Sequence, residues 1–319
     1  MKKMIKYFSP FLLLAGGSFF AYKEAFFIST SKKKHPEDML QGEEYDKVKD
    51  RMCEMISEME SVKGERVTIH AYDGKKLSGV YYHVKDGAPV HIQMHGYKGT
   101  AIRDFCGGNK LVREAGHNSI VVDQRAHGES DGHTITFGIN ERYDCVSWAQ
   151  YVQKRFGKDT PVFLSGLSMG ASTVLMAAGL DLPENVVGII ADCPFSSPEQ
   201  IIRKVCTDRK IPHRLVFPLI RMGGKMFGRF DICETDVLEA VKKKKVPLLL
   251  FHGERDKFVP CDMSWQIYAA AAEPKRLEVF PETGHGLCYL NDTSRYEKII
   301  REFTEFCLNE FQKSKVCAK

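Results

Sequence analysis

The sequence lacks the cysteine and histidine patterns that build metal or disulfide frameworks. Its ten cysteines are scattered singly, with no pair at CxxC spacing, and no cysteine–histidine cluster has the spacing of a zinc site. Several, such as Cys193 and Cys307, stand inside apolar patterns, as small buried hydrophobic residues do. A chain of 319 residues can build a large core without crosslinks. We therefore expect neither a disulfide framework nor a bound metal.

The sequence also lacks a strong charge of either sign. A formal net charge of +5 in a chain of this length argues against a nucleic-acid partner. The excess is local, because residues 199–245 carry 12 lysine or arginine residues against 6 acidic ones. This segment is most simply a solvated helical surface. The alternative is a surface that meets anionic lipid headgroups or an anionic substrate.

No uninterrupted apolar run reaches the roughly 20 residues that a bilayer-spanning helix needs. The longest covers residues 7–22 and ends at Lys23 and Glu24. If Lys23 extends its charge to the interface, the span continues through Ile28 and becomes long enough. We therefore expect an uncleaved signal anchor at residues 1–30, with the membrane as a partner. A cleavable signal peptide and a buried helix are the alternatives.

Basic residues flank this apolar segment on both sides. Lys2, Lys3 and Lys6 favour a cytoplasmic N-terminus, whereas the lysines at 32–34 oppose it. We expect the catalytic domain to be extracytoplasmic. Apolar and methionine residues then recur at helical spacing within 45–59, which predicts a juxtamembrane helix in 31–61. We expect its methionine-rich stripe to pack on the following domain; a partner-binding helix is the alternative.

From residue 62 to residue 319 the chain alternates strand and helix patterns. Short, mostly non-alternating apolar runs are typical of strands covered on both faces. The predicted strands are 66–71, 77–84, 90–94, 119–123, 161–164, 186–191, 246–251 and 277–280, and the predicted helices are 102–115, 141–156, 169–178, 261–272 and 294–311. This order predicts an α/β domain with a mostly parallel eight-stranded sheet flanked by helices.

One interval of this domain, at about 198–245, contains no strand pattern. It is helical, basic and aromatic, with Pro212, Pro218 and a glycine pair at 223–224. An insertion here would lie over the carboxyl ends of the strands, where such sheets bind ligands. We predict a helical cap, whose apolar residues either pack it on the core or line an acyl pocket.

The strongest chemical motif is Gly166-Leu167-Ser168-Met169-Gly170, between a predicted strand and a predicted helix. A nucleophilic serine in this context stands on a sharp turn with strained backbone angles, so the residues two positions away must be small. Gly166 and Gly170 meet that requirement. The start of the helix also favours negative charge that develops nearby. The motif predicts Ser168 as a nucleophile.

A serine hydroxyl needs a base, and the base needs an orienting acid. Two later strands run into loops that contain Asp256 and His285, in the chain order that follows such a serine. Glu254 and Glu282 are rival acids, but Asp256 lies a few residues beyond its strand, as the geometry requires. We predict His285 as the base and Asp256 as its orienting acid.

An oxyanion hole is expected from two backbone amides. The strand 90–94 ends in His95-Gly96-Tyr97, where Gly96 allows a sharp turn that aims the Tyr97 amide into the site. The Met169 amide, directly after the nucleophile, is the second predicted donor. His95 itself is interpreted as a structural histidine rather than a proton shuttle.

Six motifs in this order resemble those of α/β-hydrolases of the bacterial serine aminopeptidase-like branch, which includes many esterases and acylglycerol lipases. The motifs are Asp73-Gly74 with Leu77-Ser78-Gly79, His95-Gly96-Tyr97, the stretch 123–130, Gly166–Gly170, the loop around Asp256, and Gly284-His285-Gly286. The resemblance covers about residues 62–311 and implies the α/β-hydrolase fold. In relatives the stretch 123–130 is a structural loop, and this chain differs there at 124–126, which would alter the pocket wall and not the triad.

The resemblance implies acyl transfer by Ser168, His285 and Asp256, without a metal or organic cofactor. We expect carboxylic esters with hydrophobic or lipid-derived acyl chains as small-molecule substrates, because an anchor would stand beside an apolar, basic cap. A serine peptidase and a non-catalytic binding scaffold are the alternatives. A serine at position 168 argues against the aspartate nucleophile of dehalogenases and epoxide hydrolases. The dispersed histidines, such as His127 and His213, argue against a metalloenzyme.

Overall fold

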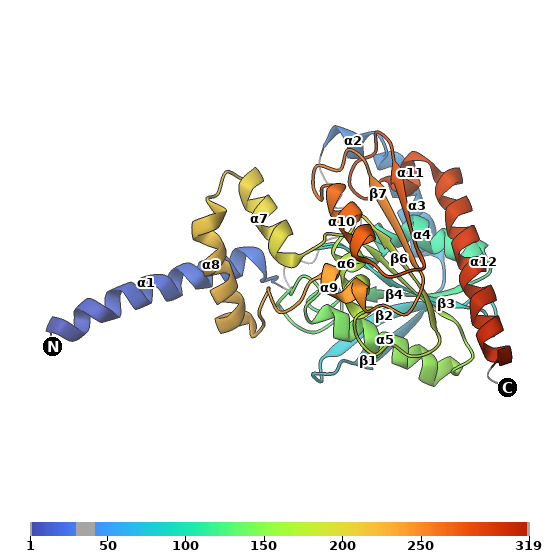
Figure 1. The fold of residues 1–319 in the computed structure, drawn as a ribbon, viewed down its shortest axis with the longest axis horizontal. Helices are drawn as coiled ribbons and strands as arrows, with labels where there is room; N and C mark the ends of the chain where they lie inside the picture. Colours follow the sequence, from blue (N-terminus) through green and yellow to red (C-terminus); the bar gives the residue numbers. More distant parts are fainter. Residues whose placement is uncertain (1, 30–41, 318–319) are drawn as a thin grey trace.

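A computed structural model of the chain describes residues 2–29 and 42–317. Its centre is an eight-stranded sheet with the strand order β1-β2-β4-β3-β5-β6-β7-β8 (Figure 1). β2 runs antiparallel to both of its neighbours, and the strands from β4 to β8 are parallel to one another. The strands are β1 (Glu65–His70), β2 (Lys76–Tyr82), β3 (Val90–Met94), β4 (Asn118–Asp123), β5 (Val162–Leu167), β6 (Val186–Asp192), β7 (Leu248–Gly253) and β8 (Lys275–Phe280). The predicted α/β-hydrolase sheet is confirmed.

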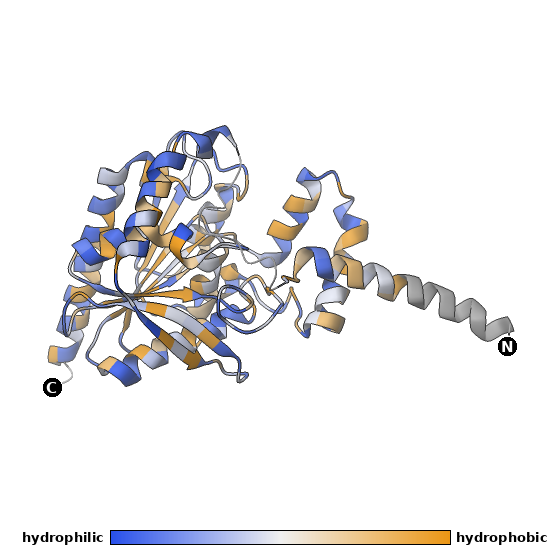
Figure 2. Cartoon of the chain, turned by 180° about the vertical axis from the view of Figure 1, so that it is seen from behind, coloured by the Kyte–Doolittle hydropathy of each residue, from blue (hydrophilic) through white to orange (hydrophobic). Residues whose placement is uncertain are grey.

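Helices cover both faces of this sheet, as the non-alternating apolar strands predict. On one face lie α5 (Glu141–Phe156), α6 (Met169–Ala177), α9 (Val237–Lys242) and α10 (Asp262–Ala270). On the other lie α3 (Lys49–Ser61), α4 (Ala101–Glu114), the short α11 (Cys288–Asn291) and α12 (Thr293–Cys317). Figure 2 shows the apolar strands at the centre, between helices that carry polar residues outward.

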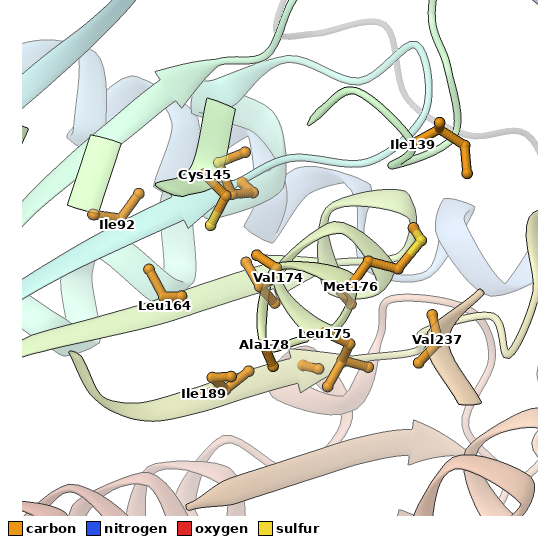
Figure 3. Close-up of a cluster of buried hydrophobic side chains, with 14 of the residues drawn as sticks. Ile92, Ile139, Cys145, Leu164, Val174, Leu175, Met176, Ala178, Ile189 and Val237 are labelled. Atoms are coloured by element: carbon orange, nitrogen blue, oxygen red, sulfur yellow. The ribbon is translucent and has the colours of Figure 1, made fainter. Parts of the chain in front are cut away.

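Side chains alternate between the two faces along each strand, so neighbouring residues enter different clusters. Leu250 of β7 joins the core under α5 and α6, whereas Leu249 and Phe251 join the cluster under α12. Figure 3 shows the first core, where strand residues such as Leu164 meet Val174 of α6. Burial of a side chain of this size contributes about 1.5–3 kcal/mol. These two cores hold the carboxyl ends of the strands, and therefore the loops after them, in fixed positions.

The methionine-rich stripe before the sheet packs on the domain, as we expected. The helical pattern of residues 45–59 corresponds to α2 (Glu43–Asp46) and α3. Met55, Ile56 and Met59 of α3 are buried against the α4 side of the molecule. The first part of the predicted helix, residues 31–41, lies outside the described residues.

The interval between β6 and β7 is helical, without a strand among its described residues. It contains α7 (Pro198–Asp208), α8 (His213–Gly223), the π-helical turn η2 (Gly224–Gly228) and α9. Figure 1 shows α7 and α8 set apart from the main sheet, beside α1 (Lys2–Ala25). Whether this insertion acts as a cap over the substrate remains a prediction.

The predicted membrane anchor at residues 1–30 is wrong. No helix within residues 2–29 and 42–317 is both long and apolar enough to cross a bilayer. The helix α1 has 24 residues, but lysines near its start and the Lys23-Glu24 pair near its end shorten its apolar part. We had inferred a membrane partner and an extracytoplasmic catalytic domain from this anchor, so both predictions lose their basis.

The end of α1 packs on the insertion and enters the core instead. Phe26 is fully buried, with its ring edge-to-face against Phe230 at 5.0 Å between centroids. The Phe26 carbonyl accepts a hydrogen bond from the Ile135 amide, and the Tyr22 hydroxyl lies 2.6 Å from Thr134 Oγ1. Gly223 of α8 faces the Ser18 carbonyl so closely that a side chain would not fit between them. These apolar residues are therefore used in packing within the chain.

Candidate active site

Ser168 stands on the sharp turn between β5 and α6 that the motif predicts. Its backbone angles, φ 55° and ψ −115°, lie in a region that non-glycine residues seldom occupy. A Cβ on Gly170 would lie 1.8 Å from the Met94 carbonyl oxygen, and one on Gly166 would lie 2.3 Å from the Gly170 carbonyl carbon. Any side chain at either position would displace backbone. The two glycines thus allow the strained turn to lie against the end of β3.

The structure brings the predicted nucleophile, base and acid side chains together. His285 Nε2 lies 3.0 Å from Ser168 Oγ, and His285 Nδ1 lies 2.6 Å from Asp256 Oδ2. A carboxylate can only accept hydrogen bonds, so Nδ1 carries the proton and donates it to Asp256. Nε2 is then free to accept the Ser168 hydroxyl proton. This is the geometry that a general base beside a serine requires.

Asp256 is held as a buried carboxylate by several donors. Its Oδ1 accepts hydrogen bonds from the Phe258 and Val259 amides, at 2.8 and 2.7 Å. Burial alone would raise the pKa of Asp256, but the nearby rings of His285 and His252, and the hydrogen bonds from them, hold it below its usual value. The side chain is therefore ionised when it faces His285.

The rival acids lie elsewhere. Glu254 is exposed to solvent, and Glu282 is exposed and pairs with Arg255 at 2.5 Å. Among these three carboxylates, Asp256 is the one that contacts the imidazole of His285. The distance to His285 therefore favours Asp256 over Glu254 and Glu282 as the orienting acid.

The two predicted oxyanion donors lie beside Ser168. A Cβ built on Gly96 would be 3.4 Å from Ser168 Cβ, so the loop that carries the Tyr97 amide lies against the nucleophile. Met169 is the first residue of α6. Within residues 2–29 and 42–317, neither the Tyr97 nor the Met169 amide donates to another protein group. Both amides are available for a negatively charged oxygen, as an oxyanion hole requires.

The chain that carries Ser168, His285 and Asp256 is similar to known proteins. The family model of the serine aminopeptidase S33 hydrolases matches residues 92–224 and 219–293, more than half of the chain. The chain belongs to this family. Membership in the serine aminopeptidase S33 hydrolases makes it a hydrolase of the α/β-hydrolase superfamily, as the motifs indicate.

Several individual proteins are similar to this S33 hydrolase. Uncharacterized protein YqkD of Bacillus subtilis is 25% identical over 275 residues, which cover 86% of this chain and 88% of YqkD. Lysophosphatidylserine lipase ABHD12 of Xenopus tropicalis is 24% identical over 256 residues, 72% of this chain and 61% of the lipase.

Solved structures show the same fold at lower identity. The Pyrococcus furiosus esterase Pf2001 superposes with a TM-score of 0.62 and 22% identity, over 78% of this chain and 92% of the esterase. Est1E of Butyrivibrio proteoclasticus, bound to ferulic acid, superposes with a TM-score of 0.58 and 20% identity, over 76% of this chain and 99% of Est1E. Both neighbours share the fold of this S33 hydrolase.

Asp104 is a site residue that the sequence reasoning missed. It lies in the first turn of α4, where its Oδ2 accepts the Gly96 amide at 2.8 Å and its Oδ1 lies 2.7 Å from Arg103. This carboxylate holds the loop that presents the Tyr97 amide. An acidic residue in the first turn after the glycine turn is the signal that could have identified it.

Tyr45 is a second missed residue, from the segment before the sheet. Its hydroxyl donates to the His285 carbonyl oxygen at 3.0 Å, and burial raises its pKa. α2 and α3 thus form a wall of the S33 hydrolase site. Tyr45 stood in the amphipathic stripe, but nothing in that pattern indicated contact with a loop 240 residues away.

His95 has the structural role that we expected. It is fully buried, its Nδ1 donates to the Gly96 carbonyl at 2.8 Å and its Nε2 accepts the Gln124 amide at 3.1 Å. Both ring nitrogens are therefore used within the loops. The departure at 124–126 is also structural, since buried Arg125 pairs with Asp144 at 2.6 Å.

One group of potential metal ligands occurs among the described residues, Cys193 with Asp256 and His285. The ligand atoms lie within 4.8 Å of one another. Two of the three residues are hydrogen-bonded to each other, and the Cys193 sulfur lies 3.9 Å from His285 Nε2. Burial raises the pKa of the Cys193 thiol, which keeps it protonated and a weak ligand. The arrangement therefore favours proton transfer over metal binding.

A cavity of about 320 Å³ opens beside Ser168 and His285. Its lining includes Gly96, Tyr97 and Leu167 near the nucleophile. The volume lies at the small end of the range of about 300–1,000 Å³ for ligand pockets. The site is therefore connected to a space of the size of a small substrate.

Proposed function

We propose that the protein is a serine hydrolase that cleaves carboxylic esters through an acyl-enzyme formed on Ser168. The observation that carries this proposal is the bridging position of His285, which contacts Ser168 Oγ at 3.0 Å and Asp256 at 2.6 Å. Each member comes from a different loop, and no structural need requires the three to meet. Such a constellation is recognised by geometry and roles rather than by position in the sequence.

The mechanism follows from the positions of these atoms. His285 Nε2 takes the Ser168 proton as the oxygen attacks the ester carbonyl, and Asp256 stabilises the imidazolium. The Tyr97 and Met169 amides receive the tetrahedral oxyanion. His285 then donates the proton to the leaving alcohol, and water hydrolyses the acyl-enzyme by the reverse sequence. Asp104 acts as a positioning residue, because it fixes the peptide that carries the Tyr97 amide.

Esters with hydrophobic acyl chains are the substrate class that we favour. Supporting observations are the largely apolar cavity beside Ser168 and the similarity to an esterase and to a lysophosphatidylserine lipase. We propose that the helical insertion 198–245 is a cap, because Ile201 of α7 belongs to the same buried cluster as Met169, and Tyr97 packs against this cluster.

A serine peptidase is the second candidate, since the matching family model is described by an aminopeptidase. A panel of p-nitrophenyl esters beside aminoacyl p-nitroanilides separates the two. We expect ester hydrolysis to exceed amide hydrolysis in kcat/KM for the full-length protein. Faster cleavage of the aminoacyl amides would replace the ester proposal with the peptidase.

A non-catalytic scaffold is the candidate from another class. A fluorophosphonate probe reacts covalently with an activated serine, and we expect the label on Ser168 by peptide mass spectrometry. His285→Ala should remove the labelling, because it removes the base. A wild-type protein that stays unlabelled would support the scaffold.

A further inference from the structure

The cavity beside Ser168 extends along one face of the sheet. Side chains alternate along a strand, so His91 and Gln93 of β3 share a face, as do Ser165 and Leu167 of β5. The register aligns them, because His91 pairs with Phe163 and Gln93 pairs with Ser165. The cavity is lined by His91 and Gln93 of β3, by Ser165 and Leu167 of β5, and by Ile190 and Asp192 of β6. The cavity therefore lies on the face that α4 and α12 cover.

Helices from two parts of the chain form the opposite wall. The apolar wall residues are Met52 and Met55 of α3, Phe105 and Val112 of α4, Leu290 of α11 and Ile300 of α12. Gly107 and Gly108 of α4 also line the cavity. A Cβ on Gly108 would meet Phe105 Cδ1 at 3.2 Å and Gln93 Nε2 at 3.8 Å. The absence of a side chain at this position leaves room between α4 and the sheet.

The insertion 198–245 is not part of this wall. None of its residues lines the cavity in the part of the chain that the structure describes. Its buried apolar residues, such as Ile202, Phe217 and Ile220, pack in the core with α1 and α6, on the other face of the sheet. Of the two roles that we predicted for the apolar residues of the insertion, packing on the core is the one that these residues have.

His91, a polar residue of the lining, lies far from Ser168. His91 pairs with Phe163, five residues before Ser168, which at about 3.3 Å per residue places it about 16 Å from the nucleophile. His91 is buried, its Nε2 lies 3.0 Å from His117, and its Nδ1 has no hydrogen-bond partner among the described residues. Burial and the neighbouring His117 lower its pKa, so the ring is neutral. A methyl terminus driven against this unpaired nitrogen would be unfavourable.

We propose that this cavity binds the acyl group of the substrate as a single extended chain, between the sheet and the wall formed by α3 and α4. The carbonyl carbon of the acyl group lies at Ser168, and the chain ends before it reaches His91. This inference rests on the proposed ester hydrolysis. The insertion, proposed above as a cap, contacts the alcohol part of the ester and not the acyl chain. Chain length is set by Met55 and Gly108, and by the unpaired nitrogen of His91. The helix α3, which precedes the region matched by the family model, thus becomes part of the specificity site.

Two variants that fill the cavity test this proposal, each measured with p-nitrophenyl esters from acetate to palmitate. In the wild type, kcat/KM should rise by up to about fourfold per methylene and then fall once the chain reaches His91. Gly108→Val and Met55→Trp should lower the octanoate-to-acetate ratio by about tenfold or more. Because both residues line the proposed acyl site, the readout is the octanoate-to-acetate ratio within each variant. An equal loss of acetate and octanoate hydrolysis would count against the proposal.

Leu215→Trp is the matched control, because Leu215 lies in α8 of the insertion and is 73% exposed. Its chain-length profile should equal that of the wild type. An unchanged profile in both cavity variants, or a shifted profile in Leu215→Trp, would overturn the proposal. Fluorophosphonate labelling of Ser168 in each variant separates this result from a failure of the ester proposal.

A second measurement needs no variant. Alkyl fluorophosphonates with ethyl, octyl and hexadecyl chains are attached to Ser168 of the wild-type protein, and the melting temperature of each adduct is compared. The octyl adduct should melt highest, because its chain is buried and ends before His91. Equal melting temperatures for the ethyl and octyl adducts would place the chain outside the cavity and contradict the inference.

Discussion

Asp256 Oδ2 lies 2.6 Å from His285 Nδ1, although 29 residues separate the two in the chain. Asp256 follows β7 and His285 follows β8, and these strands pair in parallel from Leu248–Lys275 to Gly253–Phe280. Adjacent parallel strands deliver the loops after them to the same edge of the sheet. The register of two strands thus places a carboxylate against one nitrogen of the imidazole and leaves the other nitrogen facing Ser168.

Replacing this carboxylate tests its role against the rival on the next loop. Asp256→Asn should lower kcat by about 10⁴-fold, because an amide no longer fixes the proton on His285 Nδ1. Glu282→Gln is the matched control, since Glu282 is exposed and pairs with Arg255. Its kcat should stay near wild type. A large loss in Glu282→Gln together with an active Asp256→Asn would reverse the assignment.

The lowered pKa of Asp256 predicts a specific dependence of stability on pH. Its ionised form is favoured in the folded state, so its contribution is complete above the unfolded pKa of about 3.9 and is lost as the pH falls towards the lower folded value. Urea unfolding of wild type and Asp256→Asn between pH 3 and 7 measures this contribution. The difference should be constant from pH 7 to about 5 and shrink below about 4. A difference that already falls at pH 6 would mean a raised pKa.

Asp104 should affect the rate through the oxyanion loop. Asp104→Ala removes the acceptor of the Gly96 amide, so the Tyr97 amide loses its fixed aim, and kcat should fall by up to about 10²-fold with little change in KM. Asp104→Asn keeps an acceptor oxygen and should restore part of the rate. Asp86→Ala, on a fully exposed side chain, is the control. If Asp104→Ala lowers the melting temperature but not kcat, the residue is structural only.

The end of α1 should contribute to the stability of the domain. Phe26→Ala should lower the free energy of unfolding by about 3–5 kcal/mol, because the ring is fully buried against Phe230 and Phe137. Phe20→Ala is the control, since Phe20 is 68% exposed, and should change it by about 0.5 kcal/mol or less. Equal, small effects in chemical denaturation would show that this segment is not part of the core.

The sequence predicted the central architecture because each signal there is local. Short β-branched and leucine-rich runs gave the eight strands, and the turn glycines around Ser168 allow only a small set of backbone angles. The loops of Asp256 and His285 could be placed because they follow strands directly. The observed β5 runs to Leu167, beyond the predicted end at residue 164, because the strand continues into the nucleophile turn.

The features that could not be predicted from the sequence depend on contacts between segments that are distant in the chain. Residues 7–28 have the composition of an anchor, and only the structure shows that Tyr22 and Phe26 are buried in the core of the chain. Tyr45 and Met55 lie in an ordinary amphipathic stripe, and their place beside the site follows from how α3 crosses α4. Gly108 of α4 and Gln93 of β3 both line the cavity, and no periodicity of the sequence indicates that they lie near each other.

The central claim is that Ser168 is a nucleophile activated by His285. Its most direct test is hydrolysis of p-nitrophenyl butyrate by purified Ser168→Ala, with circular dichroism to verify the fold. Removing the nucleophile should lower kcat by about 10⁴–10⁶-fold while the melting temperature stays close to that of the wild type. A folded Ser168→Ala protein that keeps wild-type turnover would contradict the account.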